Sequence, residues 1–297
     1  MRLAITGAAG FVGRAVAEQL ARHHPAVELL LADRDISGLS GHRTVAGDLR
    51  DPAVIAALTD DRVDAVLHLA ALPGGAAERD PSLSRAINLD APLALIERME
   101  GRRLVVAGSI AVFGGPLPDP VDDGTLPKPA SVYGTHKRMI ELAFADAVRR
   151  EAVQGMVLRL PGIVARPAAA TGFGSAFLSD VFHAARRGAP LCLPVAPDAT
   201  SWLMSVRRCA ENLVNAALGD VTEAQALTLP ALRVGMGALV AELGRQGDVS
   251  GISYQEDADT RATFGSYPGL ITARADGLGF RHDGTLAQLV ETVLADL

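Results

Sequence analysis

Short apolar runs alternate with helical patterns over the first 160 residues of the chain. The apolar runs predict buried strands at residues 3–5, 27–32, 44–46, 65–69, 104–107 and 156–160. Val12, Val16 and Leu20 recur every fourth residue and predict a helix at 10–22, and helical patterns also cover 52–58, 81–99 and 132–150. The strands are continuously apolar, as burial on both faces requires. We therefore expect an α/β fold with a doubly wound parallel sheet.

The pattern loosens after Leu160, where proline and glycine interrupt the chain at residues 161, 167, 172, 174, 190, 194 and 197. Such a segment predicts substrate-binding loops and short helices folded over the sheet, closed by a last helix at 285–297. We therefore expect a core at 1–167 that contains the sheet. A smaller substrate-binding region at 168–297 follows, with elements that return to the core.

Composition excludes several function classes. Of the 297 residues, 49% are apolar and 21% are charged, which suits a large buried core rather than a disordered chain. The net charge is -6 and no long Lys/Arg run occurs, so we do not expect nucleic acid as a partner. Cys192 and Cys209 are the two cysteines, and their spacing predicts reduced thiols without a metal site.

The location of the protein is predicted from segments that the sequence lacks. No window offers the run of roughly 18 apolar residues that a membrane span needs, so we expect no membrane partner. Met1 to Thr6 leads directly into a glycine loop, without the charged and apolar stretches of a secretory signal. The expected location is cytoplasmic.

The first chemical motif joins the first strand to the first helix, at Gly7, Gly10, Phe11, Val12 and Gly13. Glycine is needed where the backbone turns tightly and approaches a pyrophosphate, whose charge is met by the helix N-terminus. Asp33 lies 20 residues beyond Gly13 at the end of the second strand, where a carboxylate would accept hydrogen bonds from an adenosine ribose. A plain strand-to-helix turn is the alternative. The strand, the helix and Asp33 together favour a Rossmann-type dinucleotide-binding core.

The residues after the second and third strands bear on the cofactor. Asp33 would repel a 2′-phosphate and so favours NAD, while the neighbouring Arg34 keeps NADP open as an alternative. Asp48 and Leu49 follow the third strand, where a carboxylate would bind the adenine amino group and the backbone would line the ring. A helix cap ahead of Pro52 is an equally weighted alternative for Asp48.

The decisive motif is Tyr133-Gly134-Thr135-His136-Lys137, at the start of the helix expected at 132–150. Residues four apart share one face of a helix, so the phenol and the ammonium lie about one turn from each other. An ammonium beside a phenol, with the nicotinamide cation close by, lowers the pKa of the tyrosine from about 10 toward the working pH. The pair thus suits acceptance of a hydroxyl proton while hydride leaves the same carbon. The chain has three tyrosines and two lysines, which makes an ordinary surface pair at this spacing the weaker interpretation.

Three further positions support this motif. The fourth strand ends at His68, interpreted as a core histidine without chemistry, and the cofactor is expected to lie against the backbone of Leu69, Ala70 and Ala71. Ser109, at the end of the fifth strand, is placed to hydrogen-bond the substrate hydroxyl, with a turn cap as the alternative. Asn88 is unfavourable inside a helix and is expected to anchor a water or a backbone carbonyl near the lysine.

Together these residues resemble the extended short-chain dehydrogenase/reductase family, in its NAD-dependent epimerase/dehydratase branch. The resemblance covers about residues 1–167, through TGAAGFVG, Asp33, GDL, HLAA, Asn88, the Ser109 strand and YGTHK. It implies that Ser109, Tyr133 and Lys137 form the catalytic set and that Lys137 also holds the nicotinamide ribose. It further implies that Pro161 and Ile163 pack against the nicotinamide ring.

The segment after the sixth strand departs from the nucleotide-sugar epimerases of this branch. Those enzymes usually carry Arg-x-x-Asn-x-Tyr-Gly-Pro there, whereas this chain reads RLPGIVARP at 159–167. This variant, with SAF at 175–177 and WLMS at 202–205, resembles the D-erythronate dehydrogenase group, which oxidises a hydroxyl of a small sugar acid. Under that resemblance Arg166 is a candidate partner for the substrate carboxylate and Ser175 a further donor. A solvated loop charge is the alternative for Arg166, and Trp202 is expected in the core or a pocket wall.

The leading functional hypothesis is reversible oxidation of a secondary alcohol on a sugar acid, with release of NADH. The second is a sugar or nucleotide-sugar epimerase that uses the same residues and retains its NADH. The third is a non-catalytic dinucleotide-sensing protein, against which the retained Tyr/Lys pair argues. A homodimer is expected through the apolar helix faces at 84–99 and 139–148, because family members often pair through two helices of the cofactor domain.

Overall fold

The computed structural model describes residues 1–60, 62–167 and 174–297 and divides into two compact units, each built from three segments. The first unit comprises Met1–Val112, Pro129–Leu160 and Ala210–Leu227, and the second Phe113–Lys128, Pro161–Cys209 and Thr228–Leu297. Residues 113–128 therefore belong to the same unit as later segments, and residues 210–227 belong to the same unit as earlier ones. Dividing the chain at a single boundary does not produce these two units. The expected start of the second region at 168, and Gly172, lie outside the described residues.

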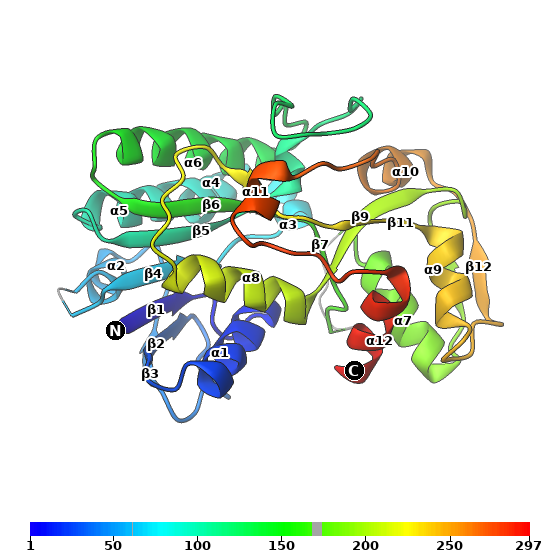
Figure 1. Cartoon of the computed structure of the whole chain (residues 1–297), viewed down its shortest axis with the longest axis horizontal. Coiled ribbons are helices and arrows are strands. Elements are labelled where there is room, and N and C mark those ends of the chain that lie inside the picture. The colour runs from blue at the N-terminus through cyan, green and yellow to red at the C-terminus, as the bar shows by residue number, and fades with distance from the viewer. Residues whose placement is uncertain (61, 168–173) are drawn as a thin grey trace. The chain divides into compact units, whose positions relative to one another are not determined.

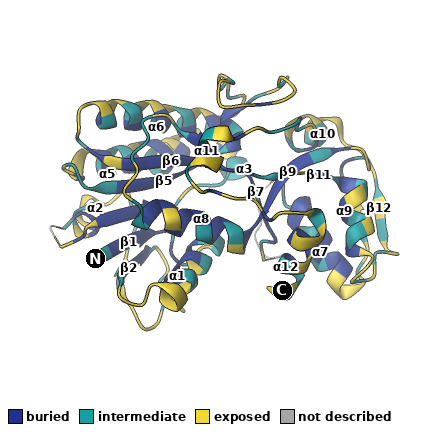
Figure 2. Ribbon diagram, viewed as in Figure 1, coloured by how far each residue is buried: buried dark blue, intermediate teal, exposed yellow. Residues whose placement is uncertain are grey.

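The first unit is organised around one seven-stranded sheet (Figure 1). Its strand order is β10 (Leu227–Thr228), β6 (Gln154–Leu160), β5 (Arg103–Ser109), β4 (Ala65–His68), β1 (Arg2–Thr6), β2 (Glu28–Asp33) and β3 (Arg43–Ala46). The pairings from β6 to β3 are all parallel, and the strands are largely buried (Figure 2), which confirms the expected α/β class. The order reverses beside β1, and ligands of such sheets bind at the carboxyl ends of the strands at this point.

The first unit has a helix at each of the four predicted segments, and a further helix at 74–79 was not predicted. Its helices are α1 (Phe11–His23), α2 (Pro52–Leu58), α3 (Gly74–Arg79), α4 (Pro81–Arg85), α5 (Ala91–Arg98) and α6 (Val132–Arg149), with the short turns η1 (Ala86–Asp90) and η2 (Ile110–Val112). The bounds of α2 are those expected, because the Asp51 side chain accepts a hydrogen bond from the Ala53 N–H and Pro52 occupies the first helical position.

The helical pattern predicted at 81–99 is confirmed over 81–98, but the helix contains a π-helical turn that was not predicted. The segment consists of α4, a π-helical turn at η1, and α5. Pro92 has no N–H to donate to the carbonyl of Asn88 four residues earlier, and its ring crowds that carbonyl. The Ala91 N–H instead donates to the Ala86 carbonyl, five residues back, which is the bond of a π-turn. Asn88 therefore lies in a widened turn rather than in a regular helix.

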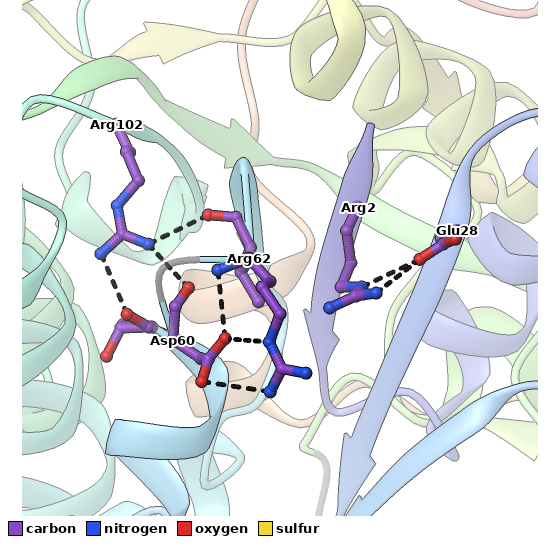
Figure 3. Close-up of polar contacts among 7 residues, drawn as sticks. Arg2, Glu28, Asp60, Arg62 and Arg102 are labelled. Atoms are coloured by element: carbon purple, nitrogen blue, oxygen red, sulfur yellow. Dashed lines mark hydrogen bonds and ion pairs between the residues drawn. The ribbon is translucent and has the colours of Figure 1, made fainter.

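Arg102 forms hydrogen bonds with the backbone of the segments that precede β5 (Figure 3). Its guanidinium donates five hydrogen bonds of 2.9–3.0 Å to the backbone carbonyls of Thr59, Asp60, Val63, Arg98 and Met99. These carbonyls belong to the end of α2, the end of α5 and the loop before β4. One side chain therefore holds these three backbone segments together. A guanidinium has five N–H donors in a fixed plane, and all of them are used here.

We expect Arg102→Lys to lower the free energy of unfolding by about 2–3 kcal/mol, because an ammonium has three donors and leaves partly buried carbonyls unpaired. The matched control is Arg62→Lys, since Arg62 is 65% exposed and forms a surface ion pair with Asp60. That change is expected to cost less than about 0.5 kcal/mol. Urea denaturation measures both, and equal losses in the two variants would contradict the role given to Arg102.

The second unit has two small sheets and a separate core. β11 (Leu232–Gly235), β9 (Thr200–Ser205) and β7 (Gly162–Val164) form one sheet, and β12 (Ile252–Tyr254) pairs with β8 (Leu191–Leu193). The helices assigned wholly to this unit are α7 (Phe177–Arg187), α9 (Met236–Leu243), α10 (Ala258–Phe264), α11 (Ala273–Gly277) and α12 (Leu286–Ala295). The expected closing helix is thus confirmed as α12. The remaining helix, α8 (Val206–Leu218), has residues in both units.

Membrane insertion finds no support in the helices. Within residues 1–60, 62–167 and 174–297, none is long and apolar enough to cross a bilayer.

Candidate active site

The glycine loop between β1 and α1 is shaped by close backbone contacts. Gly7 has φ +69°, and a Cβ there would lie 2.8 Å from the Ala70 nitrogen. A Cβ on Gly13 would lie 2.2 Å from the Gly7 carbonyl oxygen. No side chain caps the first turn of α1, because its N-cap is Gly10. The loop therefore has the bare backbone and the open helix N-terminus that a dinucleotide pyrophosphate requires, so the residues fit the expected cofactor.

The Asp33 carboxylate lies against this loop. Its Oδ2 accepts a hydrogen bond of 3.0 Å from the Ala9 N–H, and its Oδ1 accepts one of 2.7 Å from the Arg34 N–H. A carboxylate oxygen has two lone pairs, so both oxygens keep capacity for a further donor such as a ribose hydroxyl. The structure thus brings together the glycine loop and the carboxylate that were predicted at the carboxyl ends of the parallel strands β1 and β2.

The Asp48 carboxylate binds a neighbouring arginine side chain and does not cap a helix. It forms hydrogen bonds of 3.0 and 2.8 Å with the Arg50 guanidinium, and its pKa falls to about 2, chiefly through these bonds. The helix-cap alternative for Asp48 is wrong, because Asp51 caps α2. Leu49 is half-buried and packs against the core of the first unit.

The loop after β4 is held beside the glycine loop by Thr6. The Thr6 hydroxyl oxygen accepts the N–H groups of Leu69 and Ala70 at 3.1 and 3.2 Å and lies 2.8 Å from His68 Nδ1. With both acceptor positions used, the hydroxyl hydrogen is donated to His68 Nδ1, which assigns the neutral ring with its proton on Nε2. Ala71 follows as an exposed residue of the same loop.

His68 is a buried residue of β4 with a hydrogen-bond partner on one side of its ring. Its Nε2 has no hydrogen-bond partner among the described residues. Burial lowers the pKa of His68 to about 3, with a further contribution from the charge of Lys137. The interpretation as a core histidine is correct, but its polar groups are only partly satisfied.

We expect His68 to make the protein sensitive to acid. Its folded-state pKa of about 3 lies below the ordinary value of about 6.5, so the unfolded chain binds the extra proton and stability falls as the pH drops below 6.5. His68→Asn keeps an acceptor for Thr6 and does not titrate. Between pH 7 and 5 the variant is expected to lose about 2 kcal/mol less unfolding free energy than the parent chain. Equal losses in a denaturation series across this range would exclude His68 as the source.

Tyr133 and Lys137 lie on the first turns of α6. Ser131 caps the helix by accepting the Gly134 N–H at 3.0 Å, and Glu78 of α3 accepts the Val132 N–H at 2.7 Å. Lys137 is 3% exposed, and its Nζ lies 5.6 Å from the centroid of the Tyr133 ring. The two side chains therefore share one helix face, as their spacing predicts.

Lys137 is anchored to the sheet. Its Nζ donates a hydrogen bond of 2.7 Å to the carbonyl of Ala107 in β5, and burial lowers its pKa to about 8. Ala107 precedes Ser109 by two residues on the same strand. The Ser109 hydroxyl oxygen accepts the Ala111 N–H at 3.1 Å, the turn-cap contact that was weighed for it. Because that bond uses an acceptor position, the Ser109 hydroxyl hydrogen remains to be donated.

Gly134 lets α6 contact the turn that follows Ser109. A Cβ on Gly134 would lie 2.1 Å from the Ala111 carbonyl oxygen, closer than any side chain permits. The residue after the catalytic tyrosine thus sets how near the helix comes to the end of β5.

Asn88 holds a backbone carbonyl, although not at the lysine. Its side chain accepts the Leu72 N–H at 2.8 Å and donates to the Leu72 carbonyl at 3.0 Å and to the Ser84 hydroxyl at 3.0 Å. Ser84 in turn lies 2.9 Å from His136 Nδ1 on α6. Sequence reasoning missed both Ser84 and His136. The only available signal was that His136 lies inside the Tyr133–Lys137 motif.

Two candidates for the nicotinamide contact, Pro161 and Ile163, and the substrate candidates Arg166 and Ser175 belong to the second unit. Ile163 is buried in β7, and Pro161 directly precedes that strand. The backbone of Arg166 is held on both sides, by a 3.0 Å bond from its N–H to Ser179 and a 2.6 Å bond between its carbonyl and His183. Ser175 is half-buried just before α7. The roles of these residues toward cofactor and substrate stay predictions.

Trp202 lies in the core of the second unit. It is fully buried, its Nε1 donates to the Pro268 carbonyl at 2.8 Å, and its ring lies 4.7 Å from that of Tyr267. Phe113 contacts it edge-on at 6.4 Å. Of the two expected positions for Trp202, the core and a pocket wall, the structure shows the core. No cluster of metal-ligating side chains occurs in the part of the chain that the structure describes.

Known proteins are similar to this chain over nearly its whole length. A D-erythronate dehydrogenase from Cupriavidus necator is 34% identical over 100% of this chain and 98% of its own length. A D-erythronate dehydrogenase from Haemophilus influenzae is 28% identical over 98% of each chain. Among solved structures, a nucleoside-diphosphate-sugar epimerase from Agrobacterium tumefaciens has a TM-score of 0.84 at 29% identity, covering 100% of this chain and 94% of its own.

The family is shown by a match that spans most of the chain. The model of the NAD dependent epimerase/dehydratase family matches residues 3–202, which include the glycine loop, Asp33, Ser109 and the Tyr133–Lys137 motif. Two relatives that match nearly the whole chain are named dehydrogenases, so the chain is an oxidoreductase. This protein belongs to the NAD-dependent epimerase/dehydratase family.

Proposed function

We propose that this protein is an NAD-dependent dehydrogenase that oxidises a secondary hydroxyl of a small sugar acid, of the size and chemistry of D-erythronate. The observation that carries the proposal is the Tyr133–Lys137 pair, held by the Ala107 carbonyl at the end of β5. Two full-length relatives named D-erythronate dehydrogenase support the substrate class.

The residues of the first unit suit proton transfer from an alcohol. NAD, when bound, supplies the hydride acceptor. Tyr133, as phenolate, accepts the proton of the substrate hydroxyl, while the buried Lys137 ammonium favours the phenolate form by its charge. The Ala107 carbonyl fixes that ammonium, and the Ser109 hydroxyl donates its free hydrogen to the substrate oxygen. Oxidation thus yields a ketone, and the proton leaves through Tyr133.

The preference for NAD over NADP follows from Asp33. Its carboxylate is fixed beside the glycine loop by the Ala9 and Arg34 N–H groups, where a 2′-phosphate would meet like charge. The Arg34 guanidinium, one residue away, opposes this preference. The negative charge of Asp33 lies against the loop itself, so we assign NAD as the cofactor.

Arg166 is the residue assigned to the substrate carboxylate. A guanidinium binds a carboxylate by two parallel hydrogen bonds, which an ammonium does not. The bonds to Ser179 and His183 fix the backbone from which this side chain extends. Ser175, ahead of α7, is assigned as an additional donor.

The homodimer and the cytoplasmic location stay predictions. The dimer is supported by Met139 and Leu142 on α6, which expose 44% and 56% of their surface. These two residues lie on the helix that carries the catalytic pair. Apolar side chains of this size at the surface of a helix are typical of a face that pairs.

Absorbance at the NADH band, with NAD and a panel of four- to six-carbon aldonic and uronic acids, tests the proposed function. A dehydrogenase accumulates NADH with at least one acid and prefers NAD to NADP. The second candidate is an epimerase, which the Agrobacterium tumefaciens structure favours. That outcome would appear as interconversion of sugar or nucleotide-sugar isomers without net NADH, and it would overturn the proposal.

A further inference from the structure

A chain of buried and part-buried hydrogen bonds joins the loop after β4 to the helix α6. It runs from the backbone of Leu72 through the Asn88 amide to the Ser84 hydroxyl and on to His136 Nδ1, at 2.8–3.0 Å per contact. Asn88 is 1% exposed and Ser84 is fully buried. We call these four residues the Asn88 network.

The direction of each hydrogen bond in the network is determined by its donors. Asn88 Nδ2 has two hydrogens, one donated to the Leu72 carbonyl and the other to the Ser84 hydroxyl oxygen. The Ser84 oxygen keeps a second lone pair, but His136 Nδ1 is the one acceptor found for its hydrogen among the described residues, so we assign that hydrogen to His136 Nδ1. This assigns His136 as an acceptor at Nδ1, which is the neutral form of the ring.

The network connects two parts of the proposed NAD site. Leu72 directly follows the Leu69–Ala71 loop, which Thr6 holds so close to the glycine loop that a Cβ on Gly7 would lie 2.8 Å from the Ala70 nitrogen. At the other end, His136 precedes Lys137 on α6. A change in the network therefore acts on both the cofactor loop and the helix that carries the catalytic lysine.

Protonation of His136 disrupts this arrangement. A charged ring carries a hydrogen on Nδ1 as well, which the second lone pair of the Ser84 oxygen accepts. The Ser84 hydrogen then loses its acceptor inside a fully buried position, so the hydroxyl must turn. That turn changes the bond that the Asn88 amide donates to Ser84, and the same amide holds Leu72.

The charges around His136 favour the neutral ring on balance. Burial lowers its pKa from the ordinary value, Asp90 of η1 and Glu78 of α3 raise it, and Arg85 of α4 lowers it. The largest of these effects is burial, so the ring is neutral at pH 7.5 and takes up a proton only in acid.

We propose that His136 and Ser84 are positioning residues for the NAD site, and that a proton on His136 loosens the cofactor loop and weakens NAD binding. The inference rests on the NAD site of the proposed function, but not on its substrate. It is measured by NAD binding alone, so failure to find a sugar-acid substrate leaves it intact.

Isothermal titration calorimetry with NAD at pH 7.5 and 5.5 tests the proposal, using the full chain, His136→Asn and His136→Leu. The parent chain is expected to bind NAD about fivefold more weakly at pH 5.5, the size of one buried hydrogen bond. Asn keeps an acceptor that does not titrate, so His136→Asn is expected to bind within about twofold at both pH values. Leu removes the acceptor, and His136→Leu is expected to bind about fivefold more weakly at pH 7.5 already.

His23→Asn on the exposed face of α1 is the matched control and is expected to keep the acid response of the parent chain. An acid response that persists in His136→Asn, or its absence in the parent chain, would overturn the proposal. Unchanged NAD affinity of His136→Leu at pH 7.5 would do so as well. If His136→Leu does not fold, Ser84→Ala removes the same hydrogen bond from the other side, with the same expected result.

Discussion

Tyr133→Phe is expected to lower kcat for sugar-acid oxidation by about a thousandfold, equal to about 4 kcal/mol of transition-state stabilisation. The change removes the phenolic oxygen and leaves the ring beside Lys137, whose Nζ lies 5.6 Å from the ring centroid. NAD affinity is expected to stay within about threefold, because the glycine loop and Asp33 are untouched. NADH absorbance gives kcat, and calorimetry with NAD gives the affinity.

Tyr254→Phe is the matched control for this experiment. Tyr254 lies on β12 in the second unit, and its variant is expected to retain the kcat of the parent chain within about twofold. A Tyr133→Phe enzyme that keeps more than about a tenth of its kcat would exclude Tyr133 as the general base. Loss of NAD binding together with activity would instead indicate a structural role for the phenol.

Gly134→Ala is expected to lower kcat/KM by about a hundredfold. The added methyl group would lie 2.1 Å from the Ala111 carbonyl oxygen, and neither partner is the flexible end of a side chain. The start of α6 must therefore move away from the turn after Ser109, carrying Tyr133 and Lys137 with it. A misplacement of about 1 Å costs about two orders of magnitude in rate when reacting groups must be aligned.

The matched control is Gly277→Ala in α11, where an added Cβ meets nothing within 4 Å. Alanine favours a helix over glycine by about 1 kcal/mol, so Gly277→Ala is expected to be neutral or slightly stabilising, with unchanged kcat/KM. A Gly134→Ala enzyme with more than about half of the parent kcat/KM would contradict this prediction. It would show that the turn after Ser109 moves to accommodate the methyl group while α6 stays in place.

The strands and most helices of the first unit were predictable because each is determined by nearby residues. Continuous apolar runs predicted β1, β2, β4, β5 and β6, and a helical pattern predicted α2 with its observed bounds. The π-turn at Asn88 was not predicted. Proline also occurs in the first turn of ordinary helices, so Pro92 alone does not indicate a π-turn. The hydrogen bond from the Ala91 N–H to the Ala86 carbonyl shows the widened turn. Periodicity does not separate these two cases.

The candidate site was predictable where a motif carries its own spacing. Gly7–Gly13 and Tyr133–Lys137 are close in sequence, so their chemistry could be predicted before the fold was known. Ser84 and His136 lie 52 residues apart and meet only because α4 packs on α6. Contacts of this kind depend on tertiary packing, which no local pattern records.

The second unit was predicted only in outline for the same reason. β8 pairs with β12, and β9 pairs with both β7 and β11, across long stretches of chain. β7, β8 and β12 have three residues each and adjoin a proline or a glycine, so a pattern of loops was expected there. Trp202 illustrates the difference, since its burial against Tyr267 and Pro268 arises from residues more than 60 positions away.

The most direct test of the proposed dehydrogenase is the fate of deuterium from D-erythronate labelled at both C2 and C3, incubated with the purified protein and NAD. The proposal predicts deuterated NADH released into solution in one-to-one ratio with a keto acid, and no such product with Tyr133→Phe. Mass spectrometry detects both species. Deuterium that remains in a sugar product of inverted configuration, with no released NADH, would contradict the proposal and identify an epimerase that retains its cofactor.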